Sequence, residues 1–161
     1  MPKPKRNKKS HVKYAEDLMS EFPKISLLTP LYNRNKWLPL MISNIVNFDY
    51  PKENLEWYIL DSKDGDEDVK LIPDEFTKEN IQAMIHPVKL KYEYINRKMT
   101  IAEKRSYLSK NMTHPYFANM DSDDIYMDSY LKYGISMLKQ NKVGLCGSPQ
   151  MIFIYPHLDS F

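Results

Sequence analysis

The sequence predicts an α/β fold in which helices cover a mainly parallel central sheet. Short apolar runs of strand length alternate along the chain with longer segments whose apolar residues recur at helical spacing. Two of the runs, residues 25–29 (ISLLT) and 55–60 (LEWYIL), are apolar at most positions, which is typical of strands buried on both faces. Strands that alternate with helices in this way are usually joined by crossovers, and their pairing is therefore parallel.

The first half of the chain supplies two strands and two helices. We expect the first strand to end at Pro30. Residues 35–48 then place apolar side chains at helical spacing, so one helix face can pack against that strand. The second strand ends at Asp61 and is followed by a polar loop, SKDGDED, after which residues around 80–85 suggest a helix.

The second half repeats the alternation. Residues 89–95 (KLKYEYI) alternate in polarity as a half-exposed strand does. Thr100 and Glu103 form a Thr-x-x-Glu capping box, which predicts a helix start, and this helix is expected to run to about Asn111. The remaining predicted elements are a strand at 115–120 (PYFANM), a helix at 126–140 and a last strand within 143–155.

Composition indicates one folded domain preceded by a basic tail. The chain has 161 residues, of which 42% are hydrophobic and 12% aromatic, enough to bury a core. Its 23 basic and 21 acidic residues leave a net charge of +2, which argues against a protein built to coat nucleic acid. Residues 1–22 are rich in lysine and are expected to be flexible, either simply solvated or contacting a membrane surface or nucleic acid. Residues 23–161 are then the folded domain.

Cysteine content and hydropathy bear on the compartment. The single Cys146 excludes a disulfide within the chain, and its apolar surroundings favour a core thiol, which fits a reducing compartment. No run approaches the roughly 20 apolar residues of a membrane-spanning helix, and the N-terminus lacks the apolar segment of a secretory signal. We therefore expect a soluble, cytoplasmic protein.

Polar side chains follow three of the predicted strands at the point where each ends. They are Tyr32, Asn33 and Arg34 after the first strand, Asp61 after the second, and Asp121, Ser122, Asp123 and Asp124 after the fourth. Because ligands of open α/β sheets bind beyond the carboxyl ends of the strands, these groups are expected to converge on one crevice.

The carboxylates at 121–124 need compensation. Three negative charges in four residues resist burial unless a cation or a set of donors offsets them, so the segment is either a solvated loop or a metal site. Oxygen ligands suit Mg²⁺ or Mn²⁺. Asp121 and Asp123 are alternate residues that share a side of an extended loop, and Asp124 can support the site from behind.

Two common phosphate-binding loops are absent from the sequence. The chain has only four glycines, and none belongs to a Gly-x-Gly-x-x-Gly or a Gly-x-x-x-x-Gly-Lys motif. If phosphates bind, a cation held by carboxylates is therefore a better candidate than backbone amides for holding them.

Four segments, taken together and in order, resemble a known family. TPLYNR after the first strand, the strand-end Asp61, TIAEKRS at a helix start and MDSDDIY after a later strand cover roughly residues 24–155. They are similar to the successive signatures of nucleotide-sugar-dependent glycosyltransferases of the GT-A fold, family 2. The resemblance implies a Rossmann-like α/β/α sandwich that uses Mn²⁺ or Mg²⁺ and a nucleoside diphosphate sugar, preferably a UDP-sugar. The acceptor would be a hydroxyl of a glycan, protein or lipid.

The resemblance also implies roles for individual residues. The nucleotide-binding set would be Pro30, Tyr32, Asn33, Arg34, Asp61, Lys104, Arg105 and Asp121. Tyr32 would stack on the base, Asp61 would accept from the base imide, and Lys104 and Arg105 would face the phosphates. Asp123 would bind the metal with Asp121, and Asp124 would support them.

The sequence also departs from the family pattern. The usual Gly and Asn of the TIAEKRS motif are Ala102 and Ser106 here, and the chain stops at Phe161, where relatives continue into an acceptor-binding segment. We expect a complete donor half without an identifiable general base. The alternatives are a non-catalytic nucleotide-sugar-binding subunit and, less favoured for want of a Gly-rich N-terminal loop, a sugar nucleotidyltransferase.

Overall fold

A computed structural model describes residues 20–62 and 70–147 of the chain. In chain order the elements are β1 (Ile25–Leu31), η1 (Asn35–Trp37), α2 (Leu38–Asn47), η2 (Lys52–Asn54), β2 (Leu55–Ser62), α3 (Glu75–Ile85), β3 (Lys89–Ile95), α4 (Ile101–Asn111), β4 (Tyr116–Asn119) and α5 (Tyr130–Asn141).

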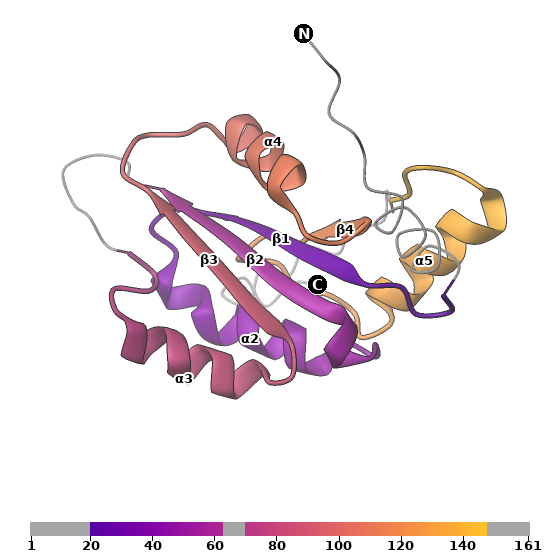
Figure 1. The fold of residues 1–161 in the computed structure, drawn as a ribbon, viewed down its shortest axis with the longest axis horizontal. Coiled ribbons are helices and arrows are strands. Elements are labelled where there is room, and N and C mark those ends of the chain that lie inside the picture. The colour runs from indigo at the N-terminus through magenta and orange to yellow at the C-terminus, as the bar shows by residue number, and fades with distance from the viewer. Residues whose placement is uncertain (1–19, 63–69, 148–161) are drawn as a thin grey trace, which may run out of the picture.

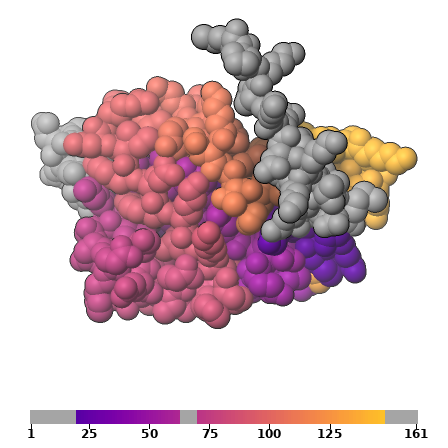
Figure 2. Space-filling model, in the orientation of Figure 1, coloured from indigo at the N-terminus to yellow at the C-terminus, as the bar shows by residue number. Residues whose placement is uncertain are grey.

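The predicted α/β fold is confirmed. The four strands form one sheet in the order β3-β2-β1-β4, and every pair of neighbours is parallel. α4 lies on one face of this sheet and α2 and α3 on the other (Figure 1). In the space-filling view α4 forms the upper part of the visible face and α3 the lower part, with α5 at the right-hand side (Figure 2).

The two central strands are buried along their whole length, because each carries apolar side chains on both faces. Leu27 and Trp57 point into a core shared with α2, α3 and α5. Leu28 and Tyr58, one residue later on each strand, belong to a second core under α4. Because successive side chains of a strand point to opposite faces, the same two strands contribute to a core on each face of the sheet.

The expectation that β1 ends at Pro30 is wrong. The strand continues to Leu31, and Pro30 pairs in register with Leu60 of β2. The ladder to β4 reaches only Leu28, whose carbonyl accepts from the backbone N–H of Met120. Pro30 lies two residues beyond Leu28, so its nitrogen faces the β4 side of β1. At that level the described residues contain no strand that would need an N–H from β1, and the N–H that proline lacks is not missed.

Helix boundaries differ more than strand boundaries. α3 begins at Glu75, ahead of the predicted 80–85, because the Asp74 side chain caps it by accepting from the N–H of Thr77 at 2.7 Å. α5 begins at Tyr130, four residues later than predicted.

Some expectations fall outside the described residues. Of the strand expected within 143–155, residues 143–147 are not a strand and the others lie outside the described part, as does most of the predicted tail. Cys146 is exposed and is not the core thiol that was expected. Where the structure describes the chain, no helix combines the length and the apolar character needed to cross a membrane.

The predicted capping box of α4 is confirmed. The N–H of Glu103 donates to Thr100 Oγ1 at 3.2 Å, and the N–H of Thr100 donates to Glu103 Oε2 at 2.7 Å. The hydrogen bonds that the Glu103 carboxylate accepts from the Thr100 N–H and hydroxyl lower its pKa below the ordinary value.

Thr100→Ala is expected to lower the free energy of unfolding by about 1 kcal/mol, because one helix N–H loses its partner. Urea denaturation measures the change. The matched control is Ser106→Ala, which replaces an exposed residue in the interior of the same helix and should cause no loss. Equal stability of Thr100→Ala and the wild-type protein would show that the cap contributes nothing.

Candidate functional site

A pocket of about 350 Å³ lies where β1, α4 and the segment after β4 meet. Its lining residues are Pro30, Leu31, Tyr32, Arg34, Met99, Ile101, Lys104, Arg105, Asp121, Ser122 and Asp123. Three segments that are far apart in the sequence therefore converge at the carboxyl ends of β1 and β4, as the parallel topology predicts.

The segment after β4, residues 121–126, is here called the acidic loop. It leaves the sheet after the Met120 N–H has donated to the Leu28 carbonyl at 3.0 Å. The N–H of Asp121 then donates to the Tyr126 hydroxyl at 2.7 Å, so the first and last residues of the loop are joined. This closure turns Asp121 and Asp123 toward the pocket, which both line.

Arginines from the other two segments pair with these carboxylates. Arg105 Nη2 lies 2.9 Å from one oxygen of Asp121 and 3.1 Å from the other, and Arg34 Nη1 lies 3.5 Å from Asp123. All four side chains are partly exposed, so each pair adds little to stability. The pairs matter for the chemistry of the site, because they place two cationic and two anionic side chains around one pocket.

Negative charge is not fully compensated in the acidic loop. Burial raises the pKa of the Asp124 carboxyl above its ordinary value, and the neighbouring charges of Asp121 and Asp123 add to the increase. Asp124 does not line the pocket, and its supporting role stays a prediction. A cation bound at the loop would favour the ionised form of all three carboxylates.

The donor set can be compared with the needs of a divalent cation. Within residues 20–62 and 70–147, no three side chains of His, Cys, Asp or Glu come together as a ready-made metal centre. Asp121 and Asp123 nevertheless present hard oxygen donors to one pocket, beside arginines that attract phosphate. This arrangement fits Mg²⁺ or Mn²⁺ that completes its coordination with phosphate oxygens and water.

Lys104 and Tyr32 form the part of the pocket nearest to β1. Lys104 is 4% exposed, and its ammonium donates to the Leu31 carbonyl at 2.5 Å. The same nitrogen lies 5.7 Å from the centre of the Tyr32 ring, which is 39% exposed. Lys104 therefore ties α4 to the end of β1, and Tyr32 offers an aromatic face on which a base can stack.

Asp61 and Asn33 are not brought into this pocket. Asp61 is 1% exposed, and its Oδ2 accepts from the Leu71 N–H at 3.0 Å and from the Tyr92 hydroxyl at 2.9 Å. It pairs with Leu31 in register, so it lies at the same sheet edge without lining the pocket. Asn33 is a turn residue in the left-handed region, with φ of 45°.

Sequence reasoning missed the residues that shape the acidic loop from behind. Asn44, on the buried side of α2, bonds to the loop backbone at two positions. Tyr126 closes the loop through its hydroxyl. The sequence did contain a signal for Asn44. It is a polar residue at a position where the helical spacing of Met41 and Ile45 predicts a buried helix face.

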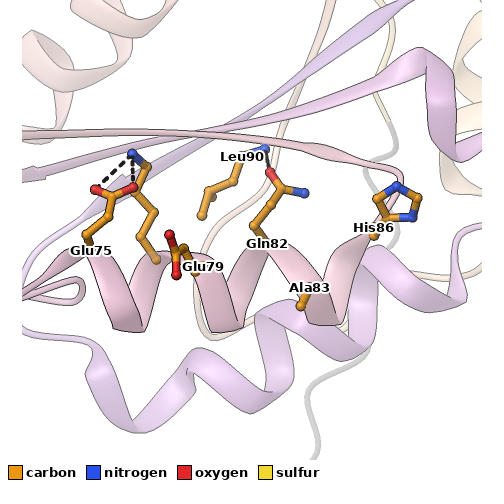
Figure 3. A pocket seen from close by; sticks show the side chains of 7 residues that line it. Glu75, Glu79, Gln82, Ala83, His86 and Leu90 are labelled. Carbon is orange, nitrogen blue, oxygen red and sulfur yellow. Dashed lines mark hydrogen bonds and ion pairs between the residues drawn. The ribbon is translucent and has the colours of Figure 1, made fainter.

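A second hollow lies between α3 and β3 (Figure 3) and has a volume of about 580 Å³. Gln82 in its wall donates to the Val88 carbonyl at 2.7 Å and accepts from the Leu90 N–H at 2.8 Å. Lys78 in turn pairs with Glu75 at 3.0 Å. None of the predicted site residues lines this hollow, so its larger volume does not make it the better candidate.

Comparison with known proteins gives the family of the chain and supports its fold. The family model for glycosyl transferase family 2 matches residues 26–159. A curated glycosyltransferase of Methanococcus voltae, which transfers a diacetamido-dideoxy-glucuronosyl group to dolichyl N-acetylglucosaminyl phosphate, is 36% identical over 58 residues. Those residues are 36% of this chain and 18% of the relative.

Solved structures agree in fold. S. aureus TarS 1-349 in complex with UDP-GlcNAc gives a TM-score of 0.59 at 20% identity, covering 79% of this chain and 37% of the TarS 1-349 chain. A mannosyltransferase from Pyrobaculum calidifontis in complex with GDP-Man and Mn²⁺ also gives 0.59 at 18% identity, covering 80% of this chain and 39% of that protein. The chain thus matches well under half the length of each of these proteins.

Proposed function

Because the chain belongs to glycosyl transferase family 2, we propose that it binds a nucleoside diphosphate sugar and a divalent cation in the pocket between β1, α4 and the acidic loop. We further propose that it supplies the donor site for transfer of the sugar to an acceptor hydroxyl. One observation carries the proposal: Arg34, Arg105, Asp121 and Asp123 come from three distant segments and surround one pocket.

The charged side chains suit a diphosphate with its cation. Asp121 and Asp123 would hold Mn²⁺ or Mg²⁺, which when bound neutralises negative charge on the departing diphosphate. Arg105 and Arg34 now pair with these carboxylates. Once a cation engages the carboxylates, both guanidinium groups would be available to phosphate oxygens, which guanidinium groups bind well.

The nucleoside would lie toward Tyr32. The half-exposed ring offers a stacking surface for any base, and Pro30 and Leu31 continue the wall. We favour uridine, on the family resemblance, and the UDP-GlcNAc complex of TarS supports this choice. The GDP-Man complex of the Pyrobaculum mannosyltransferase makes guanosine the alternative to test, and its Mn²⁺ supports the metal dependence.

The proposed reaction has a simple balance. The acceptor oxygen forms a bond to the anomeric carbon while the bond from that carbon to the diphosphate oxygen breaks. The acceptor proton passes to a base, and the diphosphate leaves with the bonding electron pair. We assign no residue of this chain to the role of base.

Calorimetric titration with UDP, GDP and CDP, each with and without Mn²⁺, tests the donor site. We expect one nucleotide, UDP first, to bind at least tenfold more tightly when Mn²⁺ is present. Metal-independent affinity would contradict the cation, and no binding at all would contradict the donor site. Transfer or slow hydrolysis of the matching sugar donor then separates an enzyme from a domain that only binds nucleotide sugars.

A further inference from the structure

α2 carries one polar side chain on its buried face. Asn44 is 4% exposed and lies between Met41 and Ile45, which are fully buried. Burial of a carboxamide is unfavourable unless its donor and its acceptor are both bonded. Here Nδ2 donates to the Asp124 carbonyl at 2.8 Å, and Oδ1 accepts from the Tyr126 N–H at 3.1 Å. Asn44 thus satisfies two backbone groups of the acidic loop as a neighbouring strand would.

These two bonds fix the far end of the acidic loop. Its near end is fixed by the bond from the Met120 N–H to the Leu28 carbonyl of the sheet. Tyr126 also packs its ring 4.9 Å from that of Tyr130, between ring centres, while its hydroxyl accepts from the Asp121 N–H. The residues between the anchors are therefore held by groups outside the pocket, from β1, α2 and α5.

The loop would not keep this shape by itself. Asp121, Asp123 and Asp124 carry like charges within four residues, and their repulsion favours a more open backbone. The arginines that offset two of these charges are partly exposed and held weakly. The hydrogen bonds of Asn44 come from a buried side chain and are themselves partly buried, and they act on the backbone whether or not the carboxylates are paired.

We propose that Asn44 is a positioning residue that holds Asp121 and Asp123 at the spacing at which both can meet one cation and its diphosphate. This inference rests on the proposed function. Asn44 does not line the pocket, so it would preorganise the site without contacting the cation or the diphosphate. Because the loop is fixed in advance, binding does not have to order it.

The test compares Asn44→Leu, of similar volume, with Asn44→Asp, which is isosteric and leaves no cavity. Leucine removes both hydrogen bonds, whereas aspartate keeps the acceptor for Tyr126 and sets a carboxylate against the Asp124 carbonyl. UDP is titrated calorimetrically with and without Mn²⁺. We expect both variants to lose at least tenfold of the affinity gain due to Mn²⁺, while affinity for UDP alone changes less than threefold.

Asn47→Leu is the matched control, because Asn47 lies on the same helix, is exposed, and donates its side-chain amide to the Ser43 hydroxyl of that helix and not to the acidic loop. It should retain the full gain due to Mn²⁺. Amide hydrogen exchange provides a readout without ligand: exchange at Tyr126 should be faster in Asn44→Leu and unchanged in Asn47→Leu.

The outcomes separate the two claims. A wild-type gain from Mn²⁺ that persists undiminished in Asn44→Leu and Asn44→Asp overturns the positioning role and leaves the proposed function standing. A wild-type protein that binds UDP without any gain from Mn²⁺ overturns the metal-dependent function and this inference with it.

Discussion

Asp123→Ala is expected to remove the gain in nucleotide affinity due to Mn²⁺, a loss of about 10- to 100-fold, while the fold is preserved. Asp123 is half-exposed, and its one described ion pair, with Arg34 at 3.5 Å, contributes at most about 1 kcal/mol. Its removal also relieves repulsion from Asp121 and Asp124, so the free energy of unfolding should be unchanged or slightly higher. Binding is followed calorimetrically and stability by urea denaturation.

Asp128→Ala is the matched control for this prediction. Asp128 is an exposed carboxylate two residues beyond the acidic loop that bonds the N–H of Ser129 and does not line the pocket. It should keep the wild-type response to Mn²⁺. If Asp123→Ala keeps that response as well, the acidic loop is only a solvated turn, and the cation has to be held by other groups.

Asp61→Ala is expected to lower the free energy of unfolding by about 3 kcal/mol, because one buried and one partly buried donor lose the carboxylate that they share. Those donors are the Leu71 N–H and the Tyr92 hydroxyl. Burial, and next the charge of Asp61, raise the pKa of Tyr92 well above its ordinary value, as befits a phenol that stays protonated and donates. The loss should appear in urea denaturation at neutral pH.

Two further variants help to explain the expected loss of stability in Asp61→Ala. Tyr92→Phe removes only one of the two donors and should cost about 1 kcal/mol. Asp61→Asn keeps the size of the side chain and suits titration with UDP and GDP. A larger loss of affinity for UDP than for GDP would give Asp61 the base-reading role implied by the family resemblance, in addition to its structural one. An Asp61→Ala protein as stable as wild type would contradict the structural role.

β1, β2 and β3 were located more accurately than α3 and α5. β3 has the predicted bounds at both ends, and the buried runs of β1 and β2 were located to within two residues. These strands have strong local signals, namely continuous apolar runs or strict alternation. The start of α3 depended on a weak apolar pattern with a cap at Asp74, and cap geometry is hard to locate without the fold.

Most of the predicted pocket residues were placed together, for a topological reason. Parallel strands bring their carboxyl ends to one edge, so residues that follow β1 and β4 had to be neighbours. Asp61 also reached that edge, but the direction of its side chain depended on Leu71 and Tyr92, which belong to later segments. Sequence position alone could not distinguish a carboxylate that faces a pocket from one that is buried.

The α/β class, the burial of β1 and β2 on both faces, the capping box of α4 and the acidic residues after β4 could be predicted from the amino-acid sequence, because each depends on neighbours within a few residues. The pairing of each arginine with its aspartate, the bond from Lys104 to the Leu31 carbonyl and the bonds from Asn44 to the acidic loop became visible only in the folded chain. The bond between Asn44 and Tyr126, for example, joins residues 82 positions apart. These partners depend on how the helices pack on the sheet, which cannot be predicted from a local sequence pattern.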